Sequence, residues 1–284
     1  MRTTKVLLAG ATGYLGKHIA EQLSKSDYQT RLIVRNKQKV QFDSDAFEIV
    51  EAEVTKPDTI KNVCENIDVV ISTVGITRQK DGLTYMDVDY QANVNLIEEA
   101  KRKGVKKFIY VSVLNGAKFR NLKICEAKEQ LGDYLKKSGL DYCIIRPNGF
   151  FSDMGDFLNM AKGGRVYLFG DGKLEANPIH GEDLAKVCVE AISSEQQEIN
   201  VGGPDILSQN EIAAMALKAM SKKVKITHLP DWTRKMIIWL MRTFTSSKTY
   251  GPIEFFMTVM ATEMLAPQYG KNRLVDFFNT KAKE

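Results

Sequence analysis

The stretch Val6–Gly16 reads VLLAGATGYLG and decides the fold. Four apolar residues predict a buried strand, and a helical pattern follows from Tyr14 to Ser24. Between them the glycines are spaced G-x-x-G-x-x-G. Glycines in this strand–turn–helix setting let the backbone approach a pyrophosphate, which free N–H groups at the helix start then hold. The stretch therefore predicts a dinucleotide site, with an ordinary strand–helix connection as the alternative.

Further strands and helices alternate after this unit. Apolar runs rich in Val and Ile predict buried parallel strands, and helical patterns lie between them. The predicted strands are 5–9, 30–34, 47–51, 69–74, 107–113 and 142–145, and the predicted helices are 14–24, 59–65, 84–103 and 127–138. This alternation is typical of an α/β fold with a doubly wound parallel sheet, the Rossmann fold. A dinucleotide should then lie across the carboxyl ends of the strands.

After Pro147 the pattern becomes mainly helical, with predicted helices at 154–162, 182–193 and 209–220. We interpret residues 1–150 as the dinucleotide-binding domain. Residues 151–284 form a smaller part that we expect to pack closely on the first, cover the cofactor and supply a substrate pocket.

Composition excludes several classes of protein. With 44% hydrophobic and 26% charged residues, the 284-residue chain is typical of a soluble globular protein. A net charge of +5 is too mild to indicate nucleic-acid binding. The four cysteines lack the spacing of a metal site and favour a reduced, cytoplasmic protein, so we expect no metal.

The chain starts directly with a predicted strand, so we expect no signal peptide. The most apolar late run, Met236–Met241, is too short to span a bilayer, which needs about 20 residues. We therefore expect no transmembrane segment. Contact of residues 231–265 with a membrane surface or a protein partner stays open.

The end of the second predicted strand indicates which cofactor binds. In NAD-preferring folds an acidic residue near this point bonds the ribose 2′-hydroxyl. Here Arg35 takes that place, with lysines nearby. A guanidinium forms charge-assisted bonds to a 2′-phosphate, so Arg35 favours NADP(H) over NAD(H). A solvated residue without a ligand is the alternative for Arg35.

Further cofactor contacts are predicted at the same ends of other strands. Glu53 and Val54 follow the third strand, where an acidic side chain can reach the adenine; a solvated surface glutamate is equally compatible. Thr73, Val74 and Gly75 end the fourth predicted strand, where a small, flexible backbone can lie alongside the cofactor ribose. The predicted contacts, with those of the glycine loop, are Gly10, Thr12, Gly13, Tyr14, Leu15, Gly16, Arg35, Glu53, Val54, Thr73, Val74, Gly75, Ser112, Lys128 and Pro147.

Besides the glycine loop, the sequence contains four later motifs: VDYQAN at 88–93, KFIYVS at 107–112, IRP at 145–147 and PIHGEDLA at 178–185. In these the chain resembles the atypical, extended branch of the short-chain dehydrogenase/reductase superfamily, over about residues 4–200. Within that branch it is similar to NmrA-like proteins, isoflavone-reductase-like enzymes, divinyl chlorophyllide reductases and Ycf39-type photosystem assembly factors.

The resemblance implies a catalytic set from which this chain departs. The superfamily uses a Ser or Thr after the fifth strand and a Tyr-x-x-x-Lys on the next helix. By register the lysine is Lys128, while Ile124 stands at the tyrosine and Val113 at the serine position. Isoleucine cannot transfer a proton, so the usual alcohol–ketone chemistry is not expected. The resemblance leaves Lys128 to bind the ribose or to act as an acid, and a surface lysine is the alternative.

We therefore expect an NADPH-dependent reductase of a conjugated or apolar small molecule. The residues after Pro147 are the candidates for an apolar substrate wall. They are Asn148, Phe150, Phe151 and Met154. For the two adjacent phenylalanines, plain core packing is an equal alternative. Two alternatives remain: a non-catalytic NADP(H)-binding sensor or assembly factor that acts through a protein partner, and a nucleotide-sugar epimerase, which the missing tyrosine disfavours.

Overall fold

A seven-stranded sheet forms the centre of the fold in the computed structural model, which describes residues 3–40, 46–77, 79 and 82–283. The strands follow the order β3-β2-β1-β4-β5-β6-β9. They are β1 Lys5–Ala9, β2 Gln29–Val34, β3 Glu48–Glu51, β4 Val69–Ser72, β5 Lys107–Val111, β6 Asp141–Pro147 and β9 Glu198–Val201. The sequence reverses direction across the sheet between β1 and β4, so the predicted doubly wound Rossmann fold is confirmed.

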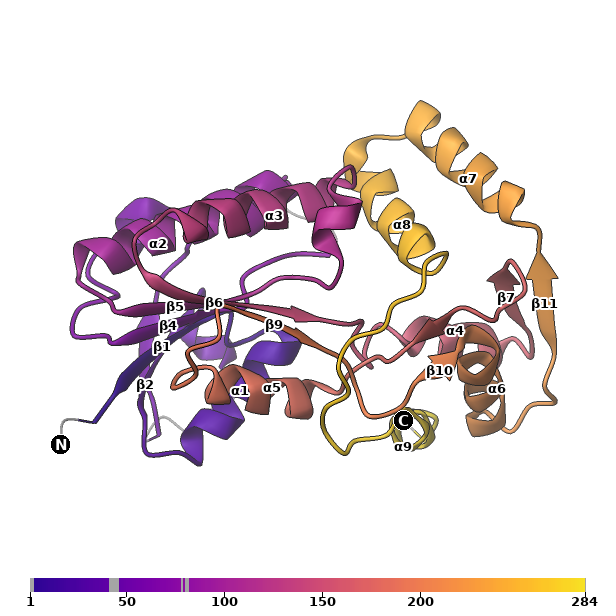
Figure 1. The fold of residues 1–284 in the computed structure, drawn as a ribbon, viewed down its shortest axis with the longest axis horizontal. Helices are drawn as coiled ribbons and strands as arrows, with labels where there is room; N and C mark the ends of the chain where they lie inside the picture. Colours follow the sequence, from indigo (N-terminus) through magenta and orange to yellow (C-terminus); the bar gives the residue numbers. More distant parts are fainter. Residues whose placement is uncertain (1–2, 41–45, 78, 80–81, 284) are drawn as a thin grey trace. The chain divides into compact units, whose positions relative to one another are not determined.

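Helices cover both faces of this sheet (Figure 1). Helices α2 (Ala92–Arg102) and α3 (Lys123–Lys136) lie on one face, and α1 (Tyr14–Ser24) and α5 (Gly181–Glu190) lie on the other. The central strands are buried along almost their whole length because they are covered from both sides. The 3-10 helices are η1 Lys37–Lys39, η2 Pro57–Ile60 and η4 Gly116–Phe119.

The structure differs from the predicted elements in three places. No α-helix forms at 59–65: the 3-10 helix η2 ends at Ile60, and Asn62 and Asn66 take left-handed φ angles of 67° and 60°. The predicted helix 84–103 begins instead as a π-helix, η3 (Met86–Gln91), before continuing as α2. Strand β9 was not predicted, because only Val201 of its four residues is buried.

The chain divides into two compact units. The first holds residues 1–146 and 184–199, and the second holds 147–183 and 200–284. The division is therefore discontinuous, unlike a single boundary at residue 150, because most of α5 and the start of β9 pack with the sheet. The second unit holds α4 Gly155–Lys162, β7 Val166–Phe169, β8 Glu175–Ala176, β10 Leu207–Ser208, α6 Gln209–Ala219, β11 Ile226–Leu229, α7 Asp231–Phe244, α8 Ser247–Val259 and α9 Leu274–Lys281.

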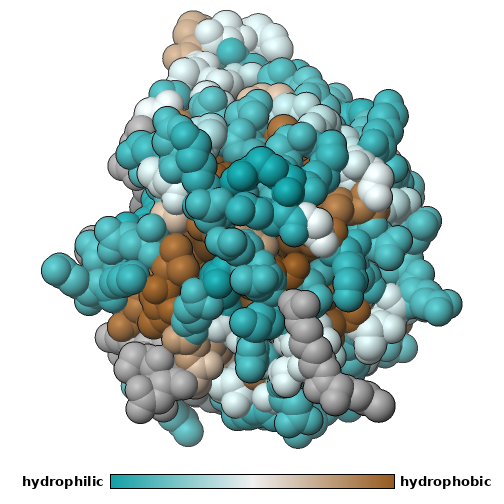
Figure 2. All heavy atoms as spheres, turned by 90° about the vertical axis from the view of Figure 1, so that its left-hand side faces the viewer, coloured by the Kyte–Doolittle hydropathy of each residue, from teal (hydrophilic) through white to brown (hydrophobic). Residues whose placement is uncertain are grey.

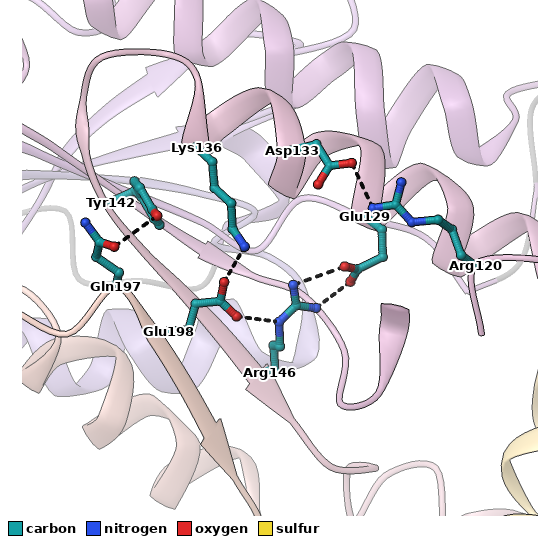
Figure 3. A network of polar contacts seen from close by, with 8 residues as sticks. All are labelled: Arg120, Glu129, Asp133, Lys136, Tyr142, Arg146, Gln197 and Glu198. Atoms are coloured by element: carbon teal, nitrogen blue, oxygen red, sulfur yellow. Dashed lines mark hydrogen bonds and ion pairs between the residues drawn. The ribbon is translucent and has the colours of Figure 1, made fainter. Parts of the chain in front are cut away.

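A polar network joins α3 to the edge of the sheet (Figure 3). Arg146, on β6, donates two hydrogen bonds to the carboxylate of Glu129 on α3, and both residues are buried. The Nε of Arg146 also contacts the Glu198 carboxylate at 3.3 Å, and Lys136 pairs with the other oxygen of Glu198. The network ties α3 to β6 and β9.

Hydrophilic side chains cover most of the face that Figure 2 shows, with hydrophobic surface appearing between them in patches. Among the described residues, no helix combines the length and the apolar character needed to cross a membrane. The same residues contain no group of three or more His, Cys, Asp or Glu side chains placed to hold a metal ion.

Candidate functional site

The loop between β1 and α1 depends on its glycines. Gly10 has a φ of +89°, and a Cβ there would lie 2.4 Å from Thr73 Oγ1. A Cβ on Gly16 would lie 2.0 Å from the carbonyl oxygen of Gly10. The N–H of Gly13 donates to that same carbonyl at 3.0 Å. The loop is thus folded tightly against the start of α1, and side chains at Gly10 and Gly16 are sterically excluded.

The start of α1 offers backbone N–H groups. Gly13 is the N-cap residue and contributes no side-chain bond, and the first turn holds no acidic residue. Thr12 and Gly13 are exposed, whereas the Leu15 side chain and Gly16 are buried, so Leu15 can serve a ligand only through its backbone. Tyr14 is half-buried and meets the ring of His18 edge-on at 5.3 Å. This arrangement suits an anion such as a pyrophosphate.

The end of β4 braces this loop. The Thr73 hydroxyl donates to the carbonyl oxygens of Ala9, at 3.2 Å, and Gly10, at 3.4 Å. The carbonyl of Val74 accepts a hydrogen bond from the buried side chain of Asn93 at 3.1 Å. Gly75 follows and is exposed. Of the three predicted residues, Thr73 and Val74 therefore support the loop and the strand end, and Gly75 presents backbone to solvent.

A buried ion pair lies directly against Gly75. Lys128 Nζ, on α3, is 2.8 Å from Asp89 Oδ1, on η3. The Asp89 side chain is fully buried and that of Lys128 is 13% exposed. The other Asp89 oxygen accepts the N–H of Ile76 at 3.1 Å. A Cβ on Gly75 would lie 2.6 Å from Asp89 Oδ1 and 3.0 Å from Lys128 Nζ, so only glycine leaves room for the pair.

The pair keeps Lys128 charged. Burial is the largest single effect and lowers the pKa of Lys128, but the attraction and hydrogen bond of Asp89, together with Tyr110 and Cys125, outweigh it, so the pKa is raised. Lys128 is therefore a firmly held ammonium group at neutral pH. A group with so high a pKa is a poor proton donor at that pH, although its charge is well placed to bind or stabilise an oxygen.

Two buried hydroxyl groups belong to Tyr110, on β5, and Ser112, which directly follows β5. Lys128 Nζ lies 5.9 Å from the ring centre of Tyr110, two residues before Ser112 on the same face of the strand. Within the described part of the chain, Tyr110 Oη and Ser112 Oγ have no hydrogen-bond partner. Tyr110 is 0% exposed and burial raises its pKa to about 12, so it does not replace the missing catalytic tyrosine.

The remaining predicted cofactor residues follow β2 and β3. Arg35 is exposed, and no hydrogen bond or ion pair ties its side chain to another described residue. Glu53 already contacts Lys56 Nζ at 2.6 Å and Thr55 Oγ1 at 3.0 Å; the Lys56 bond is the main reason that its pKa is lowered. Val54 is half-buried, and its carbonyl accepts from Asn95. Arg35 is thus available to a ligand, whereas Glu53 is occupied.

The structure gives no proton donor at the two family positions. Ile124 is 6% exposed on α3, and Val113 lies just beyond β5. Both carry only apolar atoms, so proton transfer from these positions is impossible.

The predicted substrate residues lie in the second unit, after Pro147, which ends β6. Asn148 is 5% exposed and donates to Asn177 Oδ1 and to the Met264 carbonyl, while its Oδ1 accepts the N–H of Gly149. Phe151 and Met154 belong to the core of that unit, and Phe150 is half-buried. The observed contacts of Asn148, Phe151 and Met154 are therefore internal packing and hydrogen bonds.

Sequence reasoning missed Asp89 and Asn93. Both lie in the VDYQAN motif, which was used only as a mark of resemblance. Asn93 is fully buried and its amide donates to three backbone carbonyls, those of Val74, Val88 and Asp89. A polar residue on the apolar side of a helical pattern was the available signal. It does not reveal which distant residue is the partner.

The chain is similar to known NAD(P)H-binding proteins. A family model described as NAD(P)H-binding matches residues 10–195. The chain is 26% identical over 322 residues to the divinyl chlorophyllide a 8-vinyl-reductase of Arabidopsis thaliana, covering 98% of this chain and 77% of the relative. It is 28% identical over 247 residues to the photosystem II assembly factor Ycf39 of Synechocystis, covering 85% and 74%.

A solved structure of isoflavone reductase has the same fold. It superposes on this chain with a TM-score of 0.73 at 17% sequence identity, and the superposition covers 99% of this chain and 100% of that chain.

Proposed function

The chain belongs to the NAD(P)H-binding family, in an extended branch of the short-chain dehydrogenases/reductases, and on that premise we propose that it is an NADPH-dependent reductase of conjugated, apolar small molecules. The observation that carries the proposal is the Asp89–Lys128 pair beneath Gly75, beside a glycine loop shaped for a pyrophosphate. A nicotinamide cofactor, when bound, supplies the hydride.

The described residues fit such a cofactor. The loop at 10–16 would hold the pyrophosphate through the backbone N–H groups at the start of α1, and its glycines allow the backbone to approach closely. Ser112 Oγ is a buried hydroxyl without a partner among the described residues, available to a ribose or amide. Lys128, whose Nζ lies against Gly75, would bind the nicotinamide ribose.

Arg35 supports NADPH over NADH. It is exposed at the end of β2 and unpaired within the described chain, and a guanidinium binds a 2′-phosphate through charge-assisted bonds. Arg35→Asp should reverse the preference by weakening NADPH binding about 10- to 100-fold. Titration with both cofactors measures this, and Arg120→Asp, at an exposed arginine that follows η4, serves as a charge control. An unchanged preference would show that Arg35 does not read the phosphate.

The substrate class follows from the charge state of Lys128. Without a protein acid at positions 113 and 124, reduction is favoured when the substrate itself delocalises the negative charge that hydride addition creates. A double bond conjugated to a carbonyl does so by placing the charge on oxygen. The Lys128 ammonium stabilises that oxygen without giving up its proton, and water supplies the proton to carbon.

A second function rests on a different observation. Apolar Ile124 and Val113 replace both proton-transfer residues, and a relative of similar length is named as an assembly factor. In this alternative the chain binds NADP(H) without turnover and acts through a protein partner.

One experiment separates the two functions. Purified protein is titrated with NADPH and then screened against conjugated enones and quinones for loss of NADPH absorbance. Binding followed by turnover supports the reductase. Binding without turnover of any compound contradicts it and favours the assembly factor, and absence of NADPH and NADH binding contradicts both.

A further inference from the structure

Helix α7, in the second unit, carries an apolar stripe that faces solvent. The stripe consists of residues at positions i, i+4, i+7, i+8 and i+12, which lie along one side of a helix. They are Trp232 (62% exposed), Met236 (44%), Trp239 (62%), Leu240 (38%) and Phe244 (75%). No residue of α7 is buried. The stripe therefore exposes large side chains along the full length of the helix.

The opposite side of α7 is also apolar. Ile237, Ile238 and Met241 are partly covered there, on the helix that contacts α8 (Figure 1). A helix that is apolar on two sides is normally covered on both. We therefore expect a membrane or another molecule to cover the exposed stripe when the protein functions.

The hairpin formed by α7 and α8 carries a net positive charge. Lys235 and Arg242 border the outer stripe and are 71% and 49% exposed. The two acidic residues are paired: Asp231 with Arg234 and Lys235, and Glu254, only 7% exposed, with Arg242. Four basic residues thus stand against two acidic ones in 231–259.

We propose that α7 docks the protein on the surface of an anionic lipid bilayer, lying in the plane of the headgroups. Tryptophan, phenylalanine and aliphatic side chains enter the boundary of the acyl chains, and the net positive charge of residues 231–259 attracts the acidic headgroups. Docking is independent of whether the first unit turns over a substrate.

The size of the stripe favours a bilayer over a protein partner. A 14-residue helix is about 21 Å long and, at about 10 Å width, presents about 200 Å² of face. A stable protein interface takes about 800 Å² from each partner. An interfacial helix needs only its own apolar side, inserted about 5–10 Å deep.

The chain carries its own probe for this surface. Its two tryptophans are Trp232 and Trp239, so intrinsic tryptophan fluorescence reports on the stripe alone. Full-length protein is mixed with vesicles of phosphatidylcholine, or of equal parts phosphatidylcholine and phosphatidylglycerol, and sedimented. We expect a blue shift, protection from iodide quenching and co-sedimentation with the anionic vesicles, reduced by high salt.

Variants test which residues are responsible. Met236→Gln with Leu240→Gln should weaken vesicle partitioning about tenfold while leaving both tryptophans in place, and Lys235→Gln should reduce it less. Ile206→Gln with Val224→Gln, exposed apolar residues elsewhere in the unit, is the matched control and should bind normally. Unchanged melting temperature and NADPH affinity show that the variants fold.

Three outcomes would overturn the proposal. They are the absence of partitioning into anionic vesicles, partitioning that the stripe variant does not weaken, and a blue shift that appears without lipid and follows protein concentration. The last, with dimers in analytical ultracentrifugation, would identify a second copy of the chain as the occupant.

Discussion

Lys128 and Glu129 are neighbours on α3, yet they enter two buried ion pairs of different character. Glu129 receives two hydrogen bonds from Arg146, and Arg146 is also held by Glu198, so every charge in that pair has a partner (Figure 3). Among the described residues, Lys128 pairs with Asp89 and lies near the ring of Tyr110, and the pair lies against an exposed glycine. The first pair connects helix α3 to the sheet, and the second leaves a charge within reach of a ligand.

The difference teaches where to expect stability and where to expect chemistry. Breaking a fully satisfied buried pair leaves a charge with no alternative partner and costs folding free energy. A pair that borders exposed backbone can exchange part of its interactions for a ligand at small cost. Both pairs are buried and both bring opposite charges close together. These two properties therefore do not distinguish a pair that stabilises the fold from a pair that serves a ligand.

The largest expected effect is on stability. Arg146→Met leaves the Glu129 carboxylate buried without its partner and should lower the free energy of unfolding by about 3–5 kcal/mol. Urea denaturation followed by circular dichroism measures the change. The double variant Arg146→Met with Glu129→Leu removes both charges and should recover most of the loss. If the single variant loses less than 1 kcal/mol, about the value of an exposed pair, the network is not structural.

The next effect is on turnover. Lys128→Met removes the ammonium beneath Gly75 and should lower kcat/KM about 100-fold, because the charge on the substrate oxygen loses its stabilising partner. Stopped-flow NADPH oxidation measures the rate, and Lys123→Met, an exposed lysine on the same helix, is the control. Normal turnover by Lys128→Met would show that the two pairs of α3 are both merely structural.

The smallest effect is a change in pH dependence. Since the pKa of Lys128 is raised, its contribution to stability is present below the unfolded pKa, about 10.4, and is lost only as pH rises through the higher folded value. Lys128 should therefore keep its charge from about pH 7 to about pH 10. Its deprotonation should not lower turnover over this range. In Asp89→Asn the attraction is gone and burial alone lowers the Lys128 pKa. A basic limb should then appear at lower pH, and identical profiles would contradict the assigned role of Asp89.

Local sequence was sufficient to predict much of the fold. Strands β1 and β4–β6 are short apolar runs, and their alternation with helices indicated the doubly wound sheet that the structure confirms. The failures occurred where local pattern is weak. Strand β9 has a single buried residue, and the turn after Ile60 depends on two asparagines in left-handed conformation.

The candidate site divides in the same way. The sequence by itself determined the glycine loop, because steric limits on the backbone at Gly10 and Gly16 are local and leave a recognisable spacing. It also determined that Ile124 and Val113 cannot transfer a proton. Only the tertiary structure decided that Asp89 meets Lys128, that Tyr110 is buried against them and that Asn148 serves internal hydrogen bonds. These contacts join residues far apart in the chain, so their energies depend on burial and on partners that no local pattern contains.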